Sequence, residues 1–339
     1  MNHTLFMTCV PEALDETTLY NARREPRLNY ENQYEYLSGE CLSNMRACLE
    51  IVAPPAVEEW GAAGQLGKES VTYLCLQYSA GVSIQALAQF YPASIWAWEE
   101  FRRHKQEWHA SADFVESRSN RVPALSFADQ EYGYYALPLA CLGLLLGHKA
   151  LMPRLCRVWD YVNEELNYFD ILLENLVRPY VPGRNKVAQQ YTRHLPYRKL
   201  DKVFKASPDK RPALMQKYLD EWYHASRREP YHNMDQRLSF VGYWSWESAA
   251  VTWLLGIDDS SYRHMDFYPR DLADFARQFD NSPIPADPVL SARPGQPCPR
   301  AGVWFAPHLR MKEVSMKLGE PMPSEQVGPT GGVVWYFRG

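Results

Sequence analysis

The sequence has no C-x-x-C motif, and its seven cysteines are an odd number. This pattern predicts neither a disulfide framework nor a zinc site. Residues 1–16 lack the basic segment and apolar run of a secretory signal. The strongest apolar run, residues 136–147, is shorter than the roughly 20 residues that cross a membrane. These absences predict a cytoplasmic protein that does not bind a membrane, and we expect neither a metal nor another cofactor.

Familiar catalytic motifs are also missing. The chain contains no G-x-S-x-G, no P-loop and no G-x-G-x-x-G before a helix. The segment HKQEWH holds His104 and His109, but a zinc-protease helix needs two histidines four residues apart with a glutamate beside the first, and Glu107 is misplaced. No residue is therefore predicted to be catalytic, and we expect that the protein is not an enzyme.

One carboxylate leaves an enzymatic alternative open. Glu247 shares a helical face with apolar residues. A buried carboxylate must be paired or have a raised pKa, and such a group either holds helices together or acts as a general acid or base. We favour the structural role, because no second carboxylate stands at motif spacing. The alternative is a hydrolase in which Glu247 works with His232 or His264.

Aromatic residues are abundant, at 14% of the chain, and they indicate a core filled with large rings. The clearest helical pattern is the stripe of Trp246, Ala249, Ala250, Trp253 and Leu254, which predicts a core-facing helix. The glycine at position 256 follows the stripe, as a left-handed helix cap would. Further upstream, a helix capped by the serine at position 83 is predicted to cover residues 84–91, and another helix residues 94–108.

Helical patterns end near residue 280. Six prolines within residues 283–299 exclude a helix there, and the run VVWYF at 333–337 is typical of a β-strand. The predicted fold is mainly α, with two packed helical halves in an irregular array followed by a small C-terminal β module. The expected domains are residues 1–125 (acidic, helical), 126–280 (helical) and 281–339 (a proline-rich link and the β module).

Charge is distributed unevenly within the net charge of −4. Residues 1–125 carry 10 Lys and Arg against 16 Asp and Glu, whereas residues 281–339 carry 6 against 4. A nucleic-acid-binding protein should show a basic face, so the acidic first third argues against DNA or RNA as a partner. An acidic surface suits a basic protein partner, although it is also typical of an ordinary solvated surface.

Four segments, in the same order along the chain, resemble a known family. They are LCLQYSAGVSIQAL (74–87), HLPYRKLDKVFKASPDKRPALMQKYLDEWY (194–223), FVGYWSWESAAVTWLLGIDDSSYRHMDFYPRDLADFA (240–276) and the closing residues 294–337. The first three resemble the immunity proteins that bacteria make against PoNe-type nuclease toxins, which contact-dependent systems such as type VI secretion deliver. The last resembles a β module found on several polymorphic-toxin immunity proteins. Gln77 departs from the family, where a basic residue is usual, and the resemblance is thin before residue 70.

The resemblance implies an immunity protein that binds and neutralises a cognate toxin, expected to be a nuclease, by stoichiometric occlusion. Alternatives are a hydrolase acting on a toxin product, and an adaptor or chaperone that loads a toxin for secretion. The oligomeric state stays open, a homodimer included. Carboxylates predicted to contact the toxin are Glu58, Glu59, Glu99, Glu100, Asp271 and Asp274. Family-motif positions expected to be structural are Tyr78, Gly81, Trp222, Tyr223, Trp244, Trp246, Glu247, Gly256, Asp258, Asp259, Tyr268 and Pro269.

Overall fold

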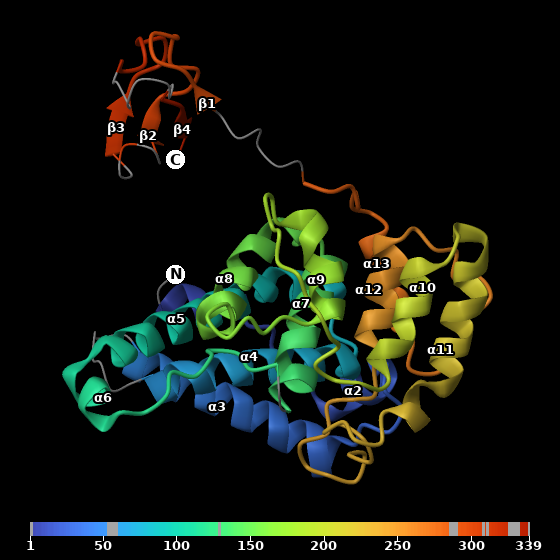
Figure 1. Ribbon diagram of the computed structural model, residues 1–339. Helices are drawn as coiled ribbons and strands as arrows, with labels where there is room; N and C mark the ends of the chain where they lie inside the picture. Colours follow the sequence, from blue (N-terminus) through green and yellow to red (C-terminus); the bar gives the residue numbers. More distant parts are fainter. Residues whose placement is uncertain are drawn as a thin grey trace. The chain divides into compact units, whose positions relative to one another are not determined.

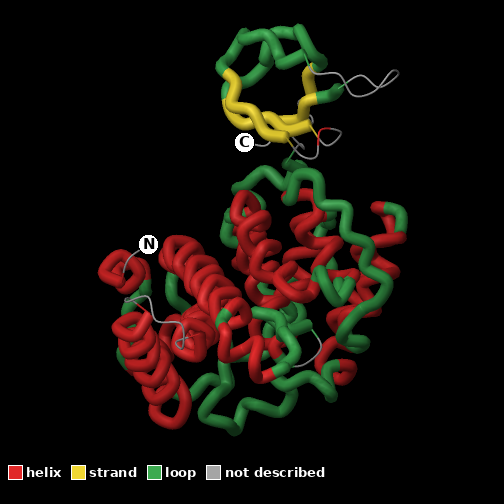
Figure 2. The backbone as a smooth tube through the Cα atoms, turned by 60° about the vertical axis from the view of Figure 1, so that its left-hand side comes forward, coloured by secondary structure: helices red, strands yellow, loops and turns green. Residues whose placement is uncertain are grey.

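The computed structural model describes residues 3–52, 60–127, 130–284, 291–306, 309, 312–324 and 333–337 (Figure 1). It divides into two compact units, Met1–Ile284 and Pro285–Gly339. Within the described residues, the first unit is built from helices and the strands lie in the second (Figure 2). The predicted mainly α fold with a small C-terminal β module is therefore confirmed, while a domain boundary near residue 125 stays a prediction.

The N-terminal part of the helical unit packs around one central helix. Its elements are α1 (His3–Cys9), α2 (Glu16–Ala22), a π-helical turn (Tyr30–Tyr34), α3 (Glu35–Val52), α4 (Trp60–Ala80), α5 (Ile84–Ala110) and α6 (Ala112–Ser117). Helix α4 lies between α3 and α5. Two glycines of α4 allow α5 to approach closely, because a Cβ at Gly64 would lie 2.9 Å from the Phe101 ring and one at Gly67 would lie 3.1 Å from the Trp98 ring.

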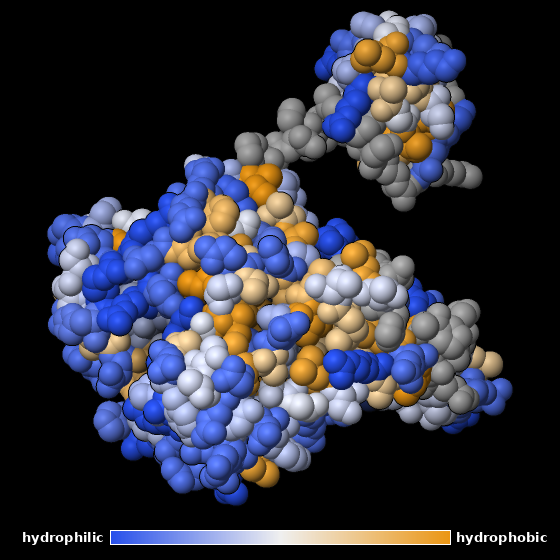
Figure 3. Space-filling model, turned by 180° about the vertical axis from the view of Figure 1, so that it is seen from behind, coloured by the Kyte–Doolittle hydropathy of each residue, from blue (hydrophilic) through white to orange (hydrophobic). Residues whose placement is uncertain are grey.

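A second group of helices includes α7 (Leu137–Leu145), all of whose residues are buried. The others are α8 (Met152–Asn163), α9 (Ile171–Val177), α10 (Asp201–Lys205), α11 (Arg211–Ala225), α12 (Trp246–Leu254) and α13 (Arg270–Ala276). Short π or 3-10 turns cover Tyr132–Ala136, Lys149–Leu151, Arg178–Tyr180, Tyr197–Leu200 and Pro208–Lys210. Helix α7 contacts α4 and α5 as well as α12 and α13, so one hydrophobic core joins both groups. On the face of this unit seen in Figure 3, mainly hydrophilic residues surround smaller hydrophobic patches.

The second unit is a small antiparallel sheet with its own core. Its described strands are β1 (Ser291–Ala292), β2 (Gly302–Ala306), β3 (Lys312–Met316) and β4 (Trp335–Phe337), in the spatial order β1-β4-β2-β3. Trp304 of β2 and Trp335 of β4 are fully buried in that core. Both indoles are satisfied, because Trp304 Nε1 donates to Arg300 O and Trp335 Nε1 to Pro323 O, each at 3.0 Å.

Helix α5 corrects one prediction. Residues 84–91 and 94–108 were expected to form separate helices, but a single helix runs through both with Pro92 inside it. Proline has no N–H, so the carbonyl of Ala88, four residues earlier, loses its usual helical partner. His148 replaces that partner: its Nε2 lies 2.7 Å from Ala88 O, and its ring stacks on Tyr91 with centroids 5.4 Å apart. The donor that makes the continuous helix tolerable thus comes from a distant part of the chain.

A double-mutant cycle tests this replacement. H148A should lower the free energy of unfolding by about 1–3 kcal/mol, because the partly buried Ala88 carbonyl loses its donor. In the P92A background the cost of H148A should fall by about 1 kcal/mol, since residue 92 regains an N–H that can donate to Ala88. Urea denaturation of the four proteins measures the coupling. Strictly additive effects would show that His148 does not compensate for Pro92.

Candidate functional site

The family-motif residues at the C-terminal end of α4 bind two other parts of the chain. The hydroxyl of Tyr78, buried in the core, donates to a carboxylate oxygen of Asp271 in α13. Burial raises the pKa of Tyr78 well above its ordinary value, and the neighbouring Asp271 carboxylate adds to the effect, so the hydroxyl remains a donor. Ser79 Oγ donates to Val241 O and accepts from Trp244 Nε1 at 2.8 Å.

The same turn also binds the N-terminal segment. The backbone N–H groups of Arg24 and Glu25 donate to Ser79 O, at 2.8 and 3.1 Å. The Arg24 guanidinium donates to Tyr78 O and Val82 O and pairs with Asp271. We call the six residues that make these contacts the α4 clamp. They are Arg24, Glu25, Tyr78, Ser79, Trp244 and Asp271.

Two glycines make the close approach possible. Gly81 has φ +98°, and a Cβ there would lie 2.1 Å from the backbone oxygen of Ala22. Gly242 has φ +102°, and a Cβ there would lie 2.3 Å from Ser79 Oγ. Any side chain at either position would therefore push the clamped segments apart.

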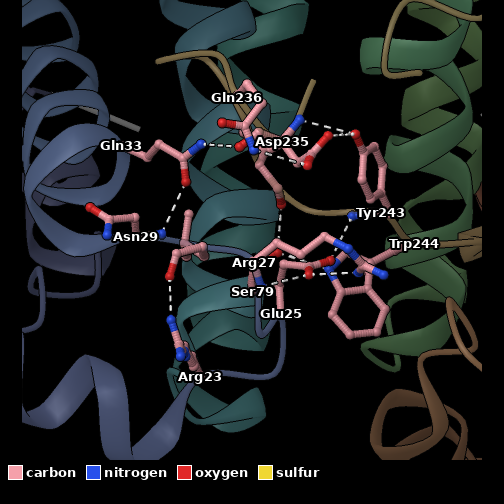
Figure 4. A network of polar contacts seen from close by, with 12 residues as sticks. Arg23, Glu25, Arg27, Asn29, Gln33, Ser79, Asp235, Gln236, Tyr243 and Trp244 are labelled. Carbon is pink, nitrogen blue, oxygen red and sulfur yellow. Dashed lines mark hydrogen bonds and ion pairs between the residues drawn. The ribbon is translucent and has the colours of Figure 1, made fainter. Parts of the chain in front are cut away.

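A polar network extends the clamp toward the loop before α12 (Figure 4). The carboxylate of Glu25 is buried, and it accepts from the N–H and Nη1 of Arg27, at 3.0 and 2.9 Å, and from the N–H of Tyr243 at 3.1 Å. Gln33 Nε2 donates to the backbone oxygen of Asp235 at 2.7 Å. The Tyr243 hydroxyl donates to Asp235 Oδ1 at 2.8 Å, and this hydrogen bond lowers the pKa of Asp235. Residues 23–33 are therefore built into the same site as residues 235–271.

A cleft of about 470 Å³ opens beside the clamp. Its wall carries five arginines from two distant segments, residues 23–27 and 263–270, namely Arg23, Arg24, Arg27, Arg263 and Arg270. Aromatic side chains also line it, namely Tyr78, Tyr243, Trp244, Phe267 and Tyr268. The Arg27 guanidinium lies 5.6 Å from the ring centroids of both Tyr243 and Phe267, within the range of a cation–π contact. The cleft can therefore offer guanidinium donors on an aromatic support.

Glu247 lies at a buried junction of helices. Its Oε1 accepts from Tyr218 Oη at 2.6 Å, Trp222 Nε1 at 2.7 Å and Ser245 Oγ at 2.9 Å. Burial raises the pKa of Glu247, while these hydrogen bonds oppose the shift. The adjoining cavity measures only about 40 Å³, far below the roughly 300 Å³ or more of an ordinary ligand pocket. This arrangement joins α11 to α12 beside a cavity too small for a typical ligand.

Neither histidine considered as a partner for Glu247 hydrogen-bonds to it. His232 stacks on Tyr223, with centroids 4.4 Å apart, and its Nδ1 lies 3.2 Å from Ser226 Oγ. His264 lines the arginine-rich cleft. Tyr223 stacks on Phe267 as well, with centroids 5.4 Å apart, so it belongs to the aromatic packing around the cleft.

The remaining family-motif residues shape the connection from α12 to α13. Gly256, at φ +59°, follows the end of α12, and Asp258 Oδ1 accepts from the N–H of Ser260 at 3.0 Å. Asp259 is buried, accepts from the Tyr268 hydroxyl at 2.9 Å and pairs with Arg277 at 2.7 Å. Pro269 is the N-cap residue of α13. Trp246 begins α12, and its ring packs edge-on against Tyr78, with centroids 5.1 Å apart.

The carboxylates predicted to contact a toxin do not form one surface group in the structure. Glu58 and Glu59 lie outside the described residues. The other four all take part in ion pairs: Glu99 with Arg154, Glu100 with Arg103, Asp271 with Arg24, and Asp274 with Arg263 and Arg277. Asp274 is the most exposed of them, at 47% of its side chain. Their role in binding stays a prediction.

Sequence reasoning did not find the cationic wall of the cleft. Three of its arginines lie in the segment ARREPR, residues 22–27, whose density of positive charge was a visible signal. Their convergence with Arg263 and Arg270 depends on the fold.

Among the described residues, no three His, Cys, Asp or Glu side chains cluster as metal ligands, and none of the helices there is both long and apolar enough to span a membrane.

Comparisons place part of the chain among known proteins. Residues 168–272 match the family described as PoNe immunity proteins (PoNi), C-terminal. A crystal structure of the Pseudomonas aeruginosa protein PA2201 has a similar fold, with a TM-score of 0.60 and 22% sequence identity over 78% of this chain and 94% of that one. No curated protein matches the chain. The matched region contains Trp222, Trp244, Glu247 and Asp271. Tyr78 and Ser79, which hydrogen-bond to Asp271 and Trp244, precede that region in the chain.

The stability of the Glu247 junction should depend on pH in a predictable direction. E247A should lower the free energy of unfolding by about 3 kcal/mol or more, because three buried donors lose their acceptor. E247Q keeps an acceptor oxygen there and should lower it by less. Burial raises the pKa of Glu247 in the folded state. The free energy of unfolding of the native protein, measured relative to that of E247Q, should therefore be highest below the ordinary pKa of 4.5, and this advantage is lost as pH rises through the folded-state pKa. Denaturation of both proteins from about pH 4 to 8 measures this. A relative stability that rises with pH would contradict the assignment.

Proposed function

We propose that this protein binds a cognate secreted toxin and holds it inactive. The proposal rests on the PoNi-like family, whose C-terminal model matches residues 168–272 of the chain. The toxin is a nuclease in this proposal, because the matched family is described as immunity proteins against PoNe. Delivery between cells by a contact-dependent system such as type VI secretion belongs to the same proposal. The family match is the single observation that carries it.

The mechanism we propose is stoichiometric and takes place in the cytoplasm, where a nuclease would reach the chromosome. The bound protein covers the toxin's active site or keeps the toxin in an inactive form. The buried Glu247 junction supports a mechanism without a catalytic step, since its carboxylate hydrogen-bonds to protein donors beside a very small cavity. No observation favours an adaptor or chaperone for secretion.

The helical unit supports this role as one body. Asp271 in the matched region pairs with Arg24 and accepts from Tyr78, both of which precede that region in the chain. A fragment limited to residues 168–272 would expose these groups and lose the clamp. We therefore propose that protection needs the N-terminal helices as well as the matched region.

A growth assay combined with calorimetry tests the proposed function. The toxin encoded beside this gene is expressed in the cytoplasm with the native protein or with E247Q. Both should restore growth, and a purified, catalytically inactive toxin should bind each of them near one-to-one with a Kd around the nanomolar range, about −12 kcal/mol.

E247Q is the matched control for catalysis, because it removes the carboxylate but retains an acceptor for the buried donors. A folded E247Q protein that binds the toxin yet fails to protect would indicate that Glu247 acts chemically. Absence of binding by the native protein would contradict the immunity role itself.

A further inference from the structure

We propose that the arginine-lined cleft beside the α4 clamp binds an acidic segment of the toxin, with toxin carboxylates against Arg23, Arg27 and Arg270. The inference rests on the proposed function and names the surface that would carry it out. It differs from the expectation that carboxylates of this protein make the contact.

Two of these arginines have no acidic partner within the part of the chain that the structure describes. Arg270, the first residue of α13, is exposed and lines the cleft without a hydrogen bond or ion pair to another described side chain. Arg23 donates from Nη1 to Leu28 O at 2.7 Å and lies 4.7 Å from the ring centroid of Tyr20. A guanidinium has five donors, so both groups can still engage a carboxylate through two parallel hydrogen bonds.

Arg27 is held in a position from which it can also engage a toxin carboxylate. Its Nη1 donates to the buried carboxylate of Glu25, and its guanidinium lies against Tyr243 and Phe267, yet its side chain is 40% exposed. A guanidinium whose position is already restricted loses less conformational entropy when a ligand binds. The Glu25 and aromatic contacts thus pre-organise the outward donors of Arg27.

The charge of the lining favours an anionic ligand in a chain of net charge −4. Five arginines line the cleft against three carboxylates, those of Glu25, Asp266 and Asp271, which leaves an excess of two positive charges. Complementary charge selects partners and accelerates their encounter. The cleft therefore differs in sign from the chain as a whole, and it would attract carboxylates.

An acidic protein segment fits better than a nucleic acid. A phosphate backbone is bound by an extended basic face, whereas here three carboxylates stand among the arginines. Arginine with tyrosine and tryptophan is the composition of protein-binding hot spots, and Tyr243 and Trp244 supply the rings. Nucleases that use divalent metal ions hold them with carboxylates, so an acidic segment is a surface whose coverage would block catalysis.

Calorimetry with the full chain tests the inference. R23E/R270E should raise the Kd for the catalytically inactive toxin encoded beside this gene by about 100-fold or more, because two attractive contacts become repulsive. R23K/R270K keeps the charge but loses the paired donors and should raise the Kd by about tenfold. The matched control is K205E/K217E, which makes the same change in net charge at side chains that are 75% and 72% exposed and do not line the cleft. It should change the Kd by less than about fivefold.

The outcomes separate the two proposals. Native binding that R23E/R270E leaves unchanged would overturn this inference and leave the immunity role intact, whereas no native binding would overturn both. A short DNA duplex that binds the native protein but not R23E/R270E, while toxin binding is unaffected, would assign the cleft to nucleic acid and overturn the inference. Circular dichroism checks the fold, and if R23E/R270E is unfolded, unchanged affinity of R23K/R270K overturns the proposal.

Discussion

The contact between the end of α4 and two distant segments determines how the helical unit is assembled. Tyr78 and Arg24 both bind the carboxylate of Asp271, and Ser79 binds the backbone of residues 24 and 25 on one side and Trp244 on the other. Gly81 and Gly242 permit this approach because neither carries a Cβ. The N-terminal segment, the end of α4 and a third part that lies more than 150 residues further along the chain are thereby held together, and the cleft is formed by the same three parts.

The clamp and the proposed binding wall are built from the same segments. The buried groups of the site are satisfied by one another, as Glu25 is by Arg27 and the Tyr243 backbone. The side chains left over on the outer wall are predominantly arginines. If the wall binds the toxin as proposed, stability and recognition use different atoms of the same segment, and substitutions at the cleft's rim should separate binding from folding more cleanly than substitutions in the clamp.

Much of the fold could be predicted from apolar periodicity. The run at 136–147 and the stripe through Trp253 correspond to the buried helices α7 and α12. The continuity of α5 could not be predicted, because a proline normally interrupts a helix and the donor that compensates for Pro92 lies 60 residues away from Ala88, on His148. Tertiary contacts of this kind leave no local pattern in the sequence.

The site was less predictable than the fold. The resemblance predicted a structural role for Tyr78, Trp244 and Glu247, which stays a prediction, and in the structure all three make side-chain hydrogen bonds. Charge counts could not show which carboxylates already have partners, and Glu99, for instance, pairs with Arg154. They also could not show that an acidic chain assembles arginines from two distant segments on one wall, because that convergence is a property of the tertiary structure.

The central claim is that the α4 clamp joins the distant segments of the helical unit. Hydrogen exchange measured by mass spectrometry on a glycine variant is its most direct test. G81A should lose protection together in residues 22–33 and 235–271, because a Cβ at position 81 would meet the Ala22 oxygen. G183A is the matched control, since Gly183 also has positive φ, +74°, but a Cβ there would meet nothing within 4 Å. If G81A loosens only the end of α4 and leaves both segments as protected as in G183A, the clamp does not hold the unit together.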